Sequence, residues 1–236
     1  MSTSLTSINF EMIYIENKKK SEVKLQEKYP NAKIVDVTSK ATTGLVKLSP
    51  FYPHGEIPIP FSEGQTAMCV EGIWQGLKVF EREDIDPKMF KNDTMKNIKR
   101  TVRKFGKPLG HRKGIRGMEL LDYIQARIQI YLPAYLWVLE NKVQYIIERL
   151  RDASKEQDIV LLDYETNDDV LNAKKPLSHA FLVKAYVEGN YPTAESLANQ
   201  KPKADPVKKE RTAKPKHPKE RKAKSKKITD HQPKLF

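Results

Sequence analysis

Residues 49–60 read Ser49-Pro50-Phe51-Tyr52-Pro53-His54-Gly55-Glu56-Ile57-Pro58-Ile59-Pro60, and after a short gap residues 70–80 read Val70-Glu71-Gly72-Ile73-Trp74-Gln75-Gly76-Leu77-Lys78-Val79-Phe80. The first segment predicts an ordered loop, because its prolines fix the backbone and cannot donate the hydrogen bonds of a helix. The second segment predicts a helix that begins with a cap at Thr66 and runs through Phe80. Its apolar residues recur at helical spacing and give the helix one face for the core.

A polar stripe lies beside that apolar face. Glu71, Gln75 and Lys78 are separated by four and three residues, so a helix brings them to one side, next to Trp74. A carboxylate and an ammonium beside a large aromatic ring could form the wall of a binding site. The other interpretation, which the spacing alone favours, is a solvated salt-bridge stripe on a core helix.

The two segments together resemble the NADAR family of N-glycosidases. Members of that family open with a Ser-Asn-Phe-type aromatic loop, followed after a gap by a helix of the form Glu-His-aromatic-aromatic-Gln-Ala-x-Lys. The matching positions in this chain are Ser49, Phe51, Glu71, Trp74, Gln75 and Lys78. Three positions depart from the pattern: Pro50 replaces the usual Asn, Gly72 the usual His and Gly76 the usual Ala.

The resemblance extends, through less specific motifs, to about residue 190. A basic, glycine-rich segment at residues 106–117 stands where family members have a Gly/Arg segment before a long helix. Leu161-Leu162-Asp163-Tyr164 and Asn167-Asp168-Asp169 are similar to the family's late strand with an acidic residue and to its Asn-Asp pair, although the usual Trp-Gly does not follow.

The resemblance implies hydrolysis of a sugar–nitrogen bond, either in ADP-ribose attached to a nucleic-acid base or in a ribosylamino phosphate. Positive charge develops on the sugar in such a reaction, and a carboxylate can stabilise it and orient water. We expect Glu71 to be the principal carboxylate, assisted by Asp163, Asp168 or Asp169. The expected substrate-binding residues are Ser49, Phe51, Trp74, Gln75, Lys78, His111 and Arg112. The alternative is a protein of the same fold that binds nucleic acid or a nucleotide and catalyses nothing.

The glycine-rich segment at residues 106–117 is the expected phosphate site. Free backbone amides and several cations can hold a phosphate there, and the guanidinium of Arg112 could grip it with two hydrogen bonds. The other interpretation is an exposed basic hairpin or loop. No histidine pair has metal-ligand spacing, so neither a metal nor a cofactor is expected. Cys69, the single cysteine, is better interpreted as a buried thiol than as a nucleophile.

Composition indicates one domain of ordinary size with an appendage, since the 236 residues are 39% hydrophobic. No apolar run is long enough to span a membrane, and the N-terminus lacks a secretory pattern. A single cysteine fits a reducing compartment. We therefore expect an intracellular, cytoplasmic protein without a membrane partner, with the nucleoid or nucleus as the alternative location if the basic C-terminal tail directs it there.

Positive charge is concentrated at the C-terminus. Residues 201–236 hold 14 Lys or Arg and four acidic residues, which gives +10 of the net charge of +13. This composition predicts a globular domain at residues 1–195 and a disordered tail at residues 196–236. Such a tail binds nucleic-acid phosphates by counterion release; a localisation signal or a solubility tail is the other interpretation. The expected contacts are Lys208, Lys209, Arg211, Lys219, Arg221, Lys222, Lys224, Lys226 and Lys227.

The remaining patterns predict an α+β fold, a helix-dominated single domain with a small sheet. Strands are expected at residues 9–15, 33–38 and 159–163, the last being a continuous apolar run that ends in acid. Helices are expected at residues 18–28, 66–80, 86–105, 118–150 with a kink or restart at Pro133, and 177–187.

Overall fold

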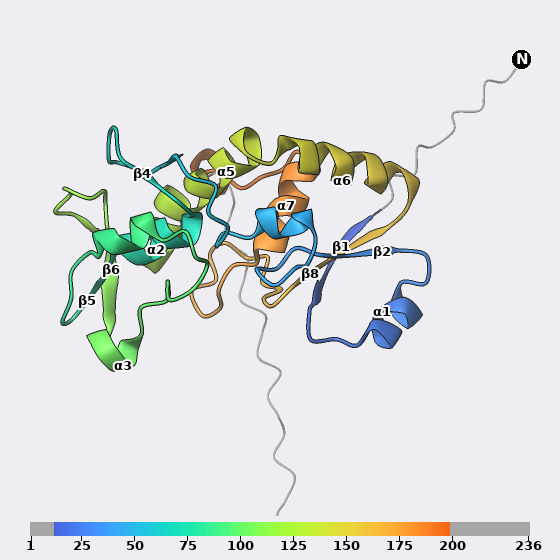
Figure 1. Ribbon diagram of the computed structural model, residues 1–236, viewed down its shortest axis with the longest axis horizontal. Helices are drawn as coiled ribbons and strands as arrows, with labels where there is room; N and C mark the ends of the chain where they lie inside the picture. The colour runs from blue at the N-terminus through green and yellow to red at the C-terminus, as the bar shows by residue number, and fades with distance from the viewer. Residues whose placement is uncertain (1–11, 199–236) are drawn as a thin grey trace, which may run out of the picture. The chain divides into compact units, whose positions relative to one another are not determined.

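Helices and three small sheets make up residues 12–198, the part of the chain that the computed structural model describes (Figure 1). The strands are β1 (Ile13–Asn17), β2 (Lys33–Asp36), β3 (Ile57–Pro58), β4 (Thr66–Ala67), β5 (Lys78–Phe80), β6 (Pro108–Arg112), β7 (Leu120–Leu121) and β8 (Ile159–Asp163). The α-helices are α1 (Glu22–Lys28), α2 (Val70–Leu77), α3 (Val102–Phe105), α4 (Tyr123–Ala126), α5 (Leu132–Asn141), α6 (Gln144–Glu156), α7 (His179–Val187) and α8 (Ala194–Ala198). Two 3₁₀ turns, η1 (Gly44–Leu48) and η2 (Pro87–Lys91), and one π-helical turn, η3 (Arg127–Tyr131), complete them. The predicted α+β class is confirmed.

β8 is the middle strand of a parallel sheet with the order β1-β8-β2, and all of its residues are buried. Val160 and Leu162 pack against Leu25 of α1 on one face. Ile159 and Leu161 join the main core on the other face. Burial on both faces is why this strand is a continuous apolar run rather than an alternating one.

The main core lies between this sheet and α2, α5, α6 and α7. Ile73 of α2, Leu139 of α5, Ile147 of α6 and Leu182 of α7 are fully buried in one continuous cluster. Figure 1 shows α5 and α6 running in succession along one side, with α7 between α6 and the sheet. The segment predicted as helix at residues 118–150 supplies much of this core through α5 and α6.

α2 is shorter than predicted at both ends. Thr66 lies in β4, and the cap is Cys69, whose Sγ accepts a hydrogen bond from the N–H of Gly72 at 3.2 Å. Its face at Gly72 and Gly76 is covered by η2. A Cβ on Gly72 would lie 2.5 Å from the carbonyl oxygen of Met89, and a Cβ on Gly76 would overlap the ring of Phe90. The two glycines therefore permit this close contact.

The predicted helix at residues 86–105 was wrong. Asp86 and Pro87 open only the short turn η2, and helical structure returns at α3. Between them, Met95 and Asn97 have φ of 58° and 56°, and the side chain of Asn92 donates to the carbonyl of Lys96. A side chain that bonds nearby backbone competes with the helix. The result is an irregular loop.

Residues 106–150 also differ from the prediction. The glycine-rich segment contains β6, which pairs with β5 and β7. Met118, where the predicted helix was expected to begin, lies outside any helix, and 83% of its surface is exposed. The helix begins after Asp122, which forms a capping box with Gln125. The irregularity expected at Pro133 takes the form of η3 just before it. A break at Lys142 and Val143 separates α5 from α6.

Several predictions concern the ends of the chain. β1 begins later than the strand expected at residues 9–15, and residues 1–11 lie outside the described part. α8 crosses the predicted domain boundary after residue 195. Residues 199–236, including every predicted nucleic-acid contact of the tail, lie outside the described residues. Within residues 12–198 no helix has both the length and the apolarity that a membrane crossing requires.

Candidate functional site

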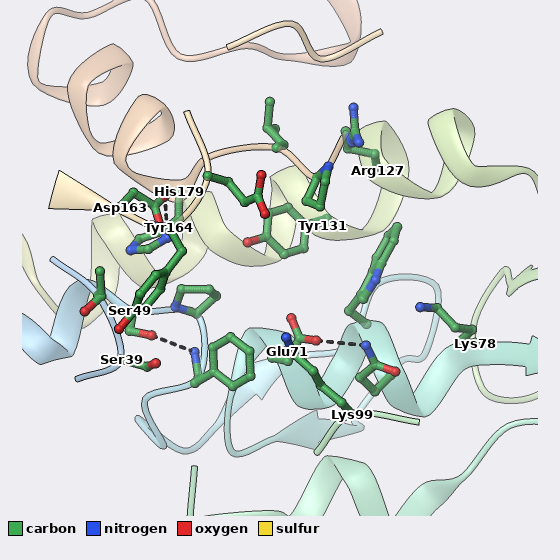
Figure 2. A pocket seen from close by; sticks show the side chains of 18 of the residues that line it. Ser39, Ser49, Glu71, Lys78, Lys99, Arg127, Tyr131, Asp163, Tyr164 and His179 are labelled. Atoms are coloured by element: carbon green, nitrogen blue, oxygen red, sulfur yellow. Dashed lines mark hydrogen bonds and ion pairs between the residues drawn. The ribbon is translucent and has the colours of Figure 1, made fainter. Parts of the chain in front are cut away.

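A cavity of about 420 Å³ opens beyond the carboxyl ends of β2 and β8, where α2, η3 and α7 meet (Figure 2). This edge of a parallel sheet is where α/β proteins place ligands, because the loops that follow the strands converge there. The volume falls within the roughly 300–1,000 Å³ usual for small-molecule sites. The walls are formed by Thr38, Ser39, Ser49, Pro50, Phe51, Glu71, Trp74, Gln75, Lys78, Lys99, Tyr123, Arg127, Tyr131, Asp163, Tyr164, Glu165, Pro176, Leu177 and His179.

Glu71 projects from the first turn of α2 into this cavity. Its side chain is buried, and its Oε1 accepts a hydrogen bond from Gln75 Nε2 at 2.8 Å. Burial raises the pKa of Glu71, while the Gln75 hydrogen bond and the charges of Lys78 and Lys99 oppose that rise. No side chain or backbone group of the described residues donates to its other oxygen, Oε2. The polar stripe of α2 thus faces a cavity rather than bulk solvent.

Trp74 forms a rigid aromatic wall beside Glu71. Its indole lies against the ring of His111 with centroids 3.8 Å apart. Tyr123 and Tyr131 meet it edge-on, at 5.6 and 5.7 Å. Because three rings hold the indole, it offers a preformed surface on which a sugar or a base can pack.

Two lysines bring positive charge to the cavity next to aromatic rings. Lys78 is partly buried, with Nζ 5.6 Å from the centroid of Trp74, and burial lowers its pKa while the charge of Glu71 opposes that shift. Lys99 is exposed at the rim, with Nζ 5.9 Å from the centroid of Phe51. Within residues 12–198 neither lysine has an acidic partner within ion-pair distance. Their charges remain available for an anionic ligand such as a phosphate.

Ser49 shapes the loop that carries Phe51 into the wall. The side chain of Ser49 is buried, and its Oγ accepts a hydrogen bond from the backbone N–H of Phe51 at 3.3 Å. The N–H of Glu71 donates to the carbonyl of Pro50 at 2.9 Å, which ties this loop to the start of α2. The aromatic loop and the helix predicted from sequence therefore form one wall.

Asp163 belongs to a buried ion pair on the opposite side of the cavity. Its Oδ2 lies 3.0 Å from His179 Nδ1 and accepts a hydrogen bond from the hydroxyl of Ser178 at 2.8 Å, while Oδ1 accepts from the N–H of Tyr164 at 2.7 Å. His179 Nε2 donates to the carbonyl of Val37 at 2.8 Å. Both ring nitrogens thus face acceptors, which favours the imidazolium form.

The pKa values of this pair move in opposite directions. Burial acts to raise the pKa of Asp163, but the charge and hydrogen bonds of His179 and Ser178 outweigh it and lower that pKa to about 2. Burial acts to lower the pKa of His179, but the charge of Asp163 outweighs it and raises that pKa. Since its oxygens are occupied, Asp163 fixes the end of β8 against α7 instead of presenting a free carboxylate.

Tyr131 reaches into the space between these two acidic residues. Figure 2 shows its hydroxyl pointing toward the cavity, with Glu71 on one side and Asp163 on the other. Burial, reinforced by the charges of Glu71 and Asp163, raises the pKa of Tyr131 well above its ordinary value. The hydroxyl therefore stays protonated and can donate a hydrogen bond to a ligand.

Four predicted site residues do not line the cavity: Asp168, Asp169, His111 and Arg112. His111 is buried behind Trp74, and burial, together with the charge of Lys78, lowers its pKa to about 3, so it is a neutral ring and not a phosphate ligand. Arg112 points to the opposite face, as successive strand residues do. It donates to both carboxylate oxygens of Asp84, at 3.1 and 2.8 Å. Within the segment at residues 106–117, residues 108–112 form β6, and the guanidinium expected to bind phosphate is paired with Asp84.

Sequence reasoning did not propose Lys99, Tyr131 or Arg127 as wall residues. Arg127 is buried and donates to the carbonyls of Val170, Asn172 and Lys175 at 2.6, 3.1 and 2.9 Å, so it orders the loop that closes one side. A charged residue at helical spacing within an apolar helix was the signal that could have identified Arg127. Lys99 lay within a wrongly predicted helix and had no such signal.

No metal site is evident in the described residues, where no group of three or more His, Cys, Asp or Glu side chains could hold an ion. Cys69 caps α2, and burial raises the pKa of its thiol to about 11, which makes it a poor nucleophile.

Comparison with known proteins gives one family match. A model described as a family of unknown function (DUF6939) matches residues 17–183, which include every residue of the cavity wall. No curated protein matches the chain.

Proposed function

The chain belongs to this family of unknown function (DUF6939), and from its cavity we propose that it is an N-glycosidase, a hydrolase that cleaves the bond between a sugar and a base nitrogen. The observation that carries the proposal is the position of Glu71. Among the described residues, Gln75 donates to one oxygen of its carboxylate and no group donates to the other, and the cavity around it has an aromatic wall and two lysines without an acidic partner.

The chemistry requires a negative group near a sugar that becomes positive. The bond between the anomeric carbon and nitrogen breaks, and its electron pair leaves with the nitrogen. Glu71 would stabilise the cation and take a proton from the water that adds to the anomeric carbon, and this proton then passes to the nitrogen of the departed base, so that the products are the free sugar and the protonated base. The protonated hydroxyl of Tyr131 can donate a hydrogen bond to the departing base. In this scheme Asp163 acts as a positioning residue, because its oxygens already accept hydrogen bonds.

The rest of the cavity suits a phosphorylated substrate. Trp74 and Phe51 would pack on the sugar or the base, and Lys78 and Lys99 would meet phosphate. These features fit ADP-ribose on a nucleic-acid base or a ribosylamino phosphate. The resemblance of residues 49–80 to NADAR enzymes supports the same chemistry.

A non-catalytic nucleotide-binding protein is the second candidate. Asp163 forms an ion pair with His179, and neither Asp168 nor Asp169 lines the cavity. Among the described residues, none of these three predicted carboxylates is therefore available in the cavity to act together with Glu71. Gly72 also stands where a NADAR helix has histidine. In this alternative the basic tail would bind nucleic acid and the cavity would hold a nucleotide without cleaving it.

Turnover separates the two candidates. We would incubate the full chain with ADP-ribosylated DNA and RNA oligonucleotides and with ribosylamino phosphates, and measure the released sugar phosphate and base by mass spectrometry. The control for Glu71→Gln is Glu148→Gln, the same change at an exposed position of α6 outside the cavity. Turnover that survives Glu148→Gln and is lost in Glu71→Gln supports the proposal. Absence of turnover by the wild type on both substrate classes would leave the binding protein.

A further inference from the structure

Positive charge within residues 1–200 is concentrated in one segment. Residues 88–107 contain eight basic residues and one acidic residue, a net charge of +7. Residues 1–200 have a net charge of only +3, so the remainder of those residues has a net charge of −4. We call residues 88–107 the basic segment.

Seven of the eight cations are exposed: Lys88, Lys91, Lys96, Lys99, Arg103, Lys104 and Lys107. None of these seven has an acidic partner within ion-pair distance in the part of the chain that the structure describes. The eighth, Arg100, is buried and donates to the carbonyls of Gln75, Lys78 and Asp84 at 3.1, 2.5 and 2.7 Å. One buried arginine thus anchors the segment to the cavity helix, while its seven basic neighbours form no ion pair with residues 12–198.

The basic segment reaches the rim of the cavity at Lys99. Consecutive α-carbons are about 3.8 Å apart, so the α-carbons of Lys96, Arg103 and Lys104 lie within about 11, 15 and 19 Å of that of Lys99. These distances are upper limits, and the screening length at physiological salt is about 8 Å, so each cation acts mainly on the anionic group next to it. The segment from Lys96 to Lys104 therefore offers several separate cations to successive phosphates of an extended ligand.

Acidic residues limit the path of such a ligand. Glu81, Glu83 and Asp84 follow β5, and Glu81 accepts a hydrogen bond from the N–H of Lys107. Asp84 is neutralised by Arg112. The end of the basic segment at Lys107 therefore lies beside negative charge, and the part from Lys96 to Lys104 is the more favourable surface.

We propose that the basic segment docks the sugar–phosphate backbone of a nucleic-acid strand, so that one nucleotide of that strand enters the cavity between Phe51 and Trp74. This inference rests on the proposed function for what happens inside the cavity, and it selects a polymeric substrate over a free nucleotide. Unpaired lysines and arginines bind phosphates by releasing condensed counterions. Phe51 and Trp74 in the cavity wall are aromatic rings that suit a base taken out of its stack.

The test is a triple charge reversal, Lys96→Glu, Arg103→Glu and Lys104→Glu, in the full chain. Lys99 is left intact because it lines the cavity. The matched control is Lys24→Glu, Lys33→Glu and Arg149→Glu, which changes the net charge equally at exposed positions outside the segment. Affinity for a fluorescent, unmodified 12-nucleotide single-stranded DNA is measured by polarisation over a salt series, and folding is checked by thermal unfolding.

We expect the segment variant to lose at least about 10-fold in affinity, and the slope of log affinity against log salt to fall by about 2, since each lost phosphate contact contributes about 0.7 for a single strand. The control should lose less than about 3-fold. Equal losses in both triples would show a general charge effect and overturn the proposal, as would wild-type affinity in the segment variant.

Binding of AMP, measured by calorimetry, separates this surface from the cavity. The segment variant should bind AMP as the wild type does, and a matching loss of AMP affinity would place these residues in the cavity and overturn the docking surface. Failure of the wild type to bind AMP counts against the proposed function, whereas the DNA measurement still decides the surface.

Discussion

Replacement of Glu71 by glutamine removes one negative charge and keeps the size of the side chain and its hydrogen bond to Gln75. If Glu71 stabilises a cationic sugar, turnover falls by about two to four orders of magnitude. That loss corresponds to about 2.7–5.4 kcal/mol at 1.36 kcal/mol per factor of ten. If Glu71 only supports α2 through its neighbours, the cost is about 0.5 kcal/mol of stability and nothing in rate.

Stability and activity should move in different directions in this variant. Burial raises the pKa of Glu71 above 4.5, so the contribution of this group to folding is complete below pH 4.5 and is lost as pH rises through the folded-state pKa. Glutamine does not ionise and escapes that loss. The variant should therefore be as stable as the wild type or more stable at pH 8, with the difference shrinking toward pH 4.

The assay is turnover on ADP-ribosylated oligonucleotides together with urea unfolding at pH 4 and pH 8. Ligand affinity should change little, because the lost interaction is mainly with the transition state. A folded Glu71→Gln protein with wild-type turnover would remove Glu71 from the mechanism. A variant that is markedly less stable at pH 8 than the wild type would show that the buried charge is a structural ion-pair partner.

Three further changes test the surroundings of the cavity. Lys78→Met should weaken AMP binding by about 1.5–3 kcal/mol, the range for a hydrogen bond to a charged group, and calorimetry that shows no loss would exclude a phosphate contact. Asp163→Asn should cost about 3–5 kcal/mol in urea unfolding near pH 5, since it leaves a buried His179 charge unpaired. In the wild type, the raised pKa of His179 stabilises the fold below pH 6.5, and this contribution is lost as pH rises through the folded-state pKa of His179. The lowered pKa of Asp163 stabilises the fold above pH 3.8, and this contribution is lost as pH falls toward about 2. Gly76→Ala should cost about 1–3 kcal/mol through overlap with η2, whereas Gly44→Ala, with no atom within 4 Å of its Cβ, should not destabilise; equal effects would refute the packing argument.

The elements that sequence predicted well are those whose pattern reflects their own burial. β8 is buried on both faces and reads as an apolar run, and α7 begins at a cap on Ser178 and is followed by Gly189 in the left-handed region. The loop at residues 92–101 was predicted as helix because its apolar residues have helical spacing. Its actual form depends on Arg100 reaching distant carbonyls and on positive φ at Met95 and Asn97, which spacing does not reveal.

The same distinction separates the site residues that a local sequence pattern predicted from those that it did not. Glu71 and Gln75 were found because α2 carries them, Lys78 because it directly follows that helix as the first residue of β5, and Asp163 because it ends an apolar strand. His111 was expected beside Arg112 on a loop. Once the segment is a strand, the two side chains point to opposite faces, and neither reaches the cavity. Lys99 and Tyr131 reach the cavity wall only through tertiary contacts, which no local sequence pattern indicates.

The position of β8 in the sheet has a consequence for the order of folding. β1 is among the first residues of the described chain, yet its partner strand lies 146 residues later, as in the pairing of Ile13 with Ile159. β2 has the same partner. During synthesis both early strands must wait with open edges until β8 has left the ribosome, and contacts of such long range form slowly. The cavity edge that carries Asp163 and His179 is then completed last, so we expect truncated or stalled chains to expose strand edges to chaperones and to aggregation.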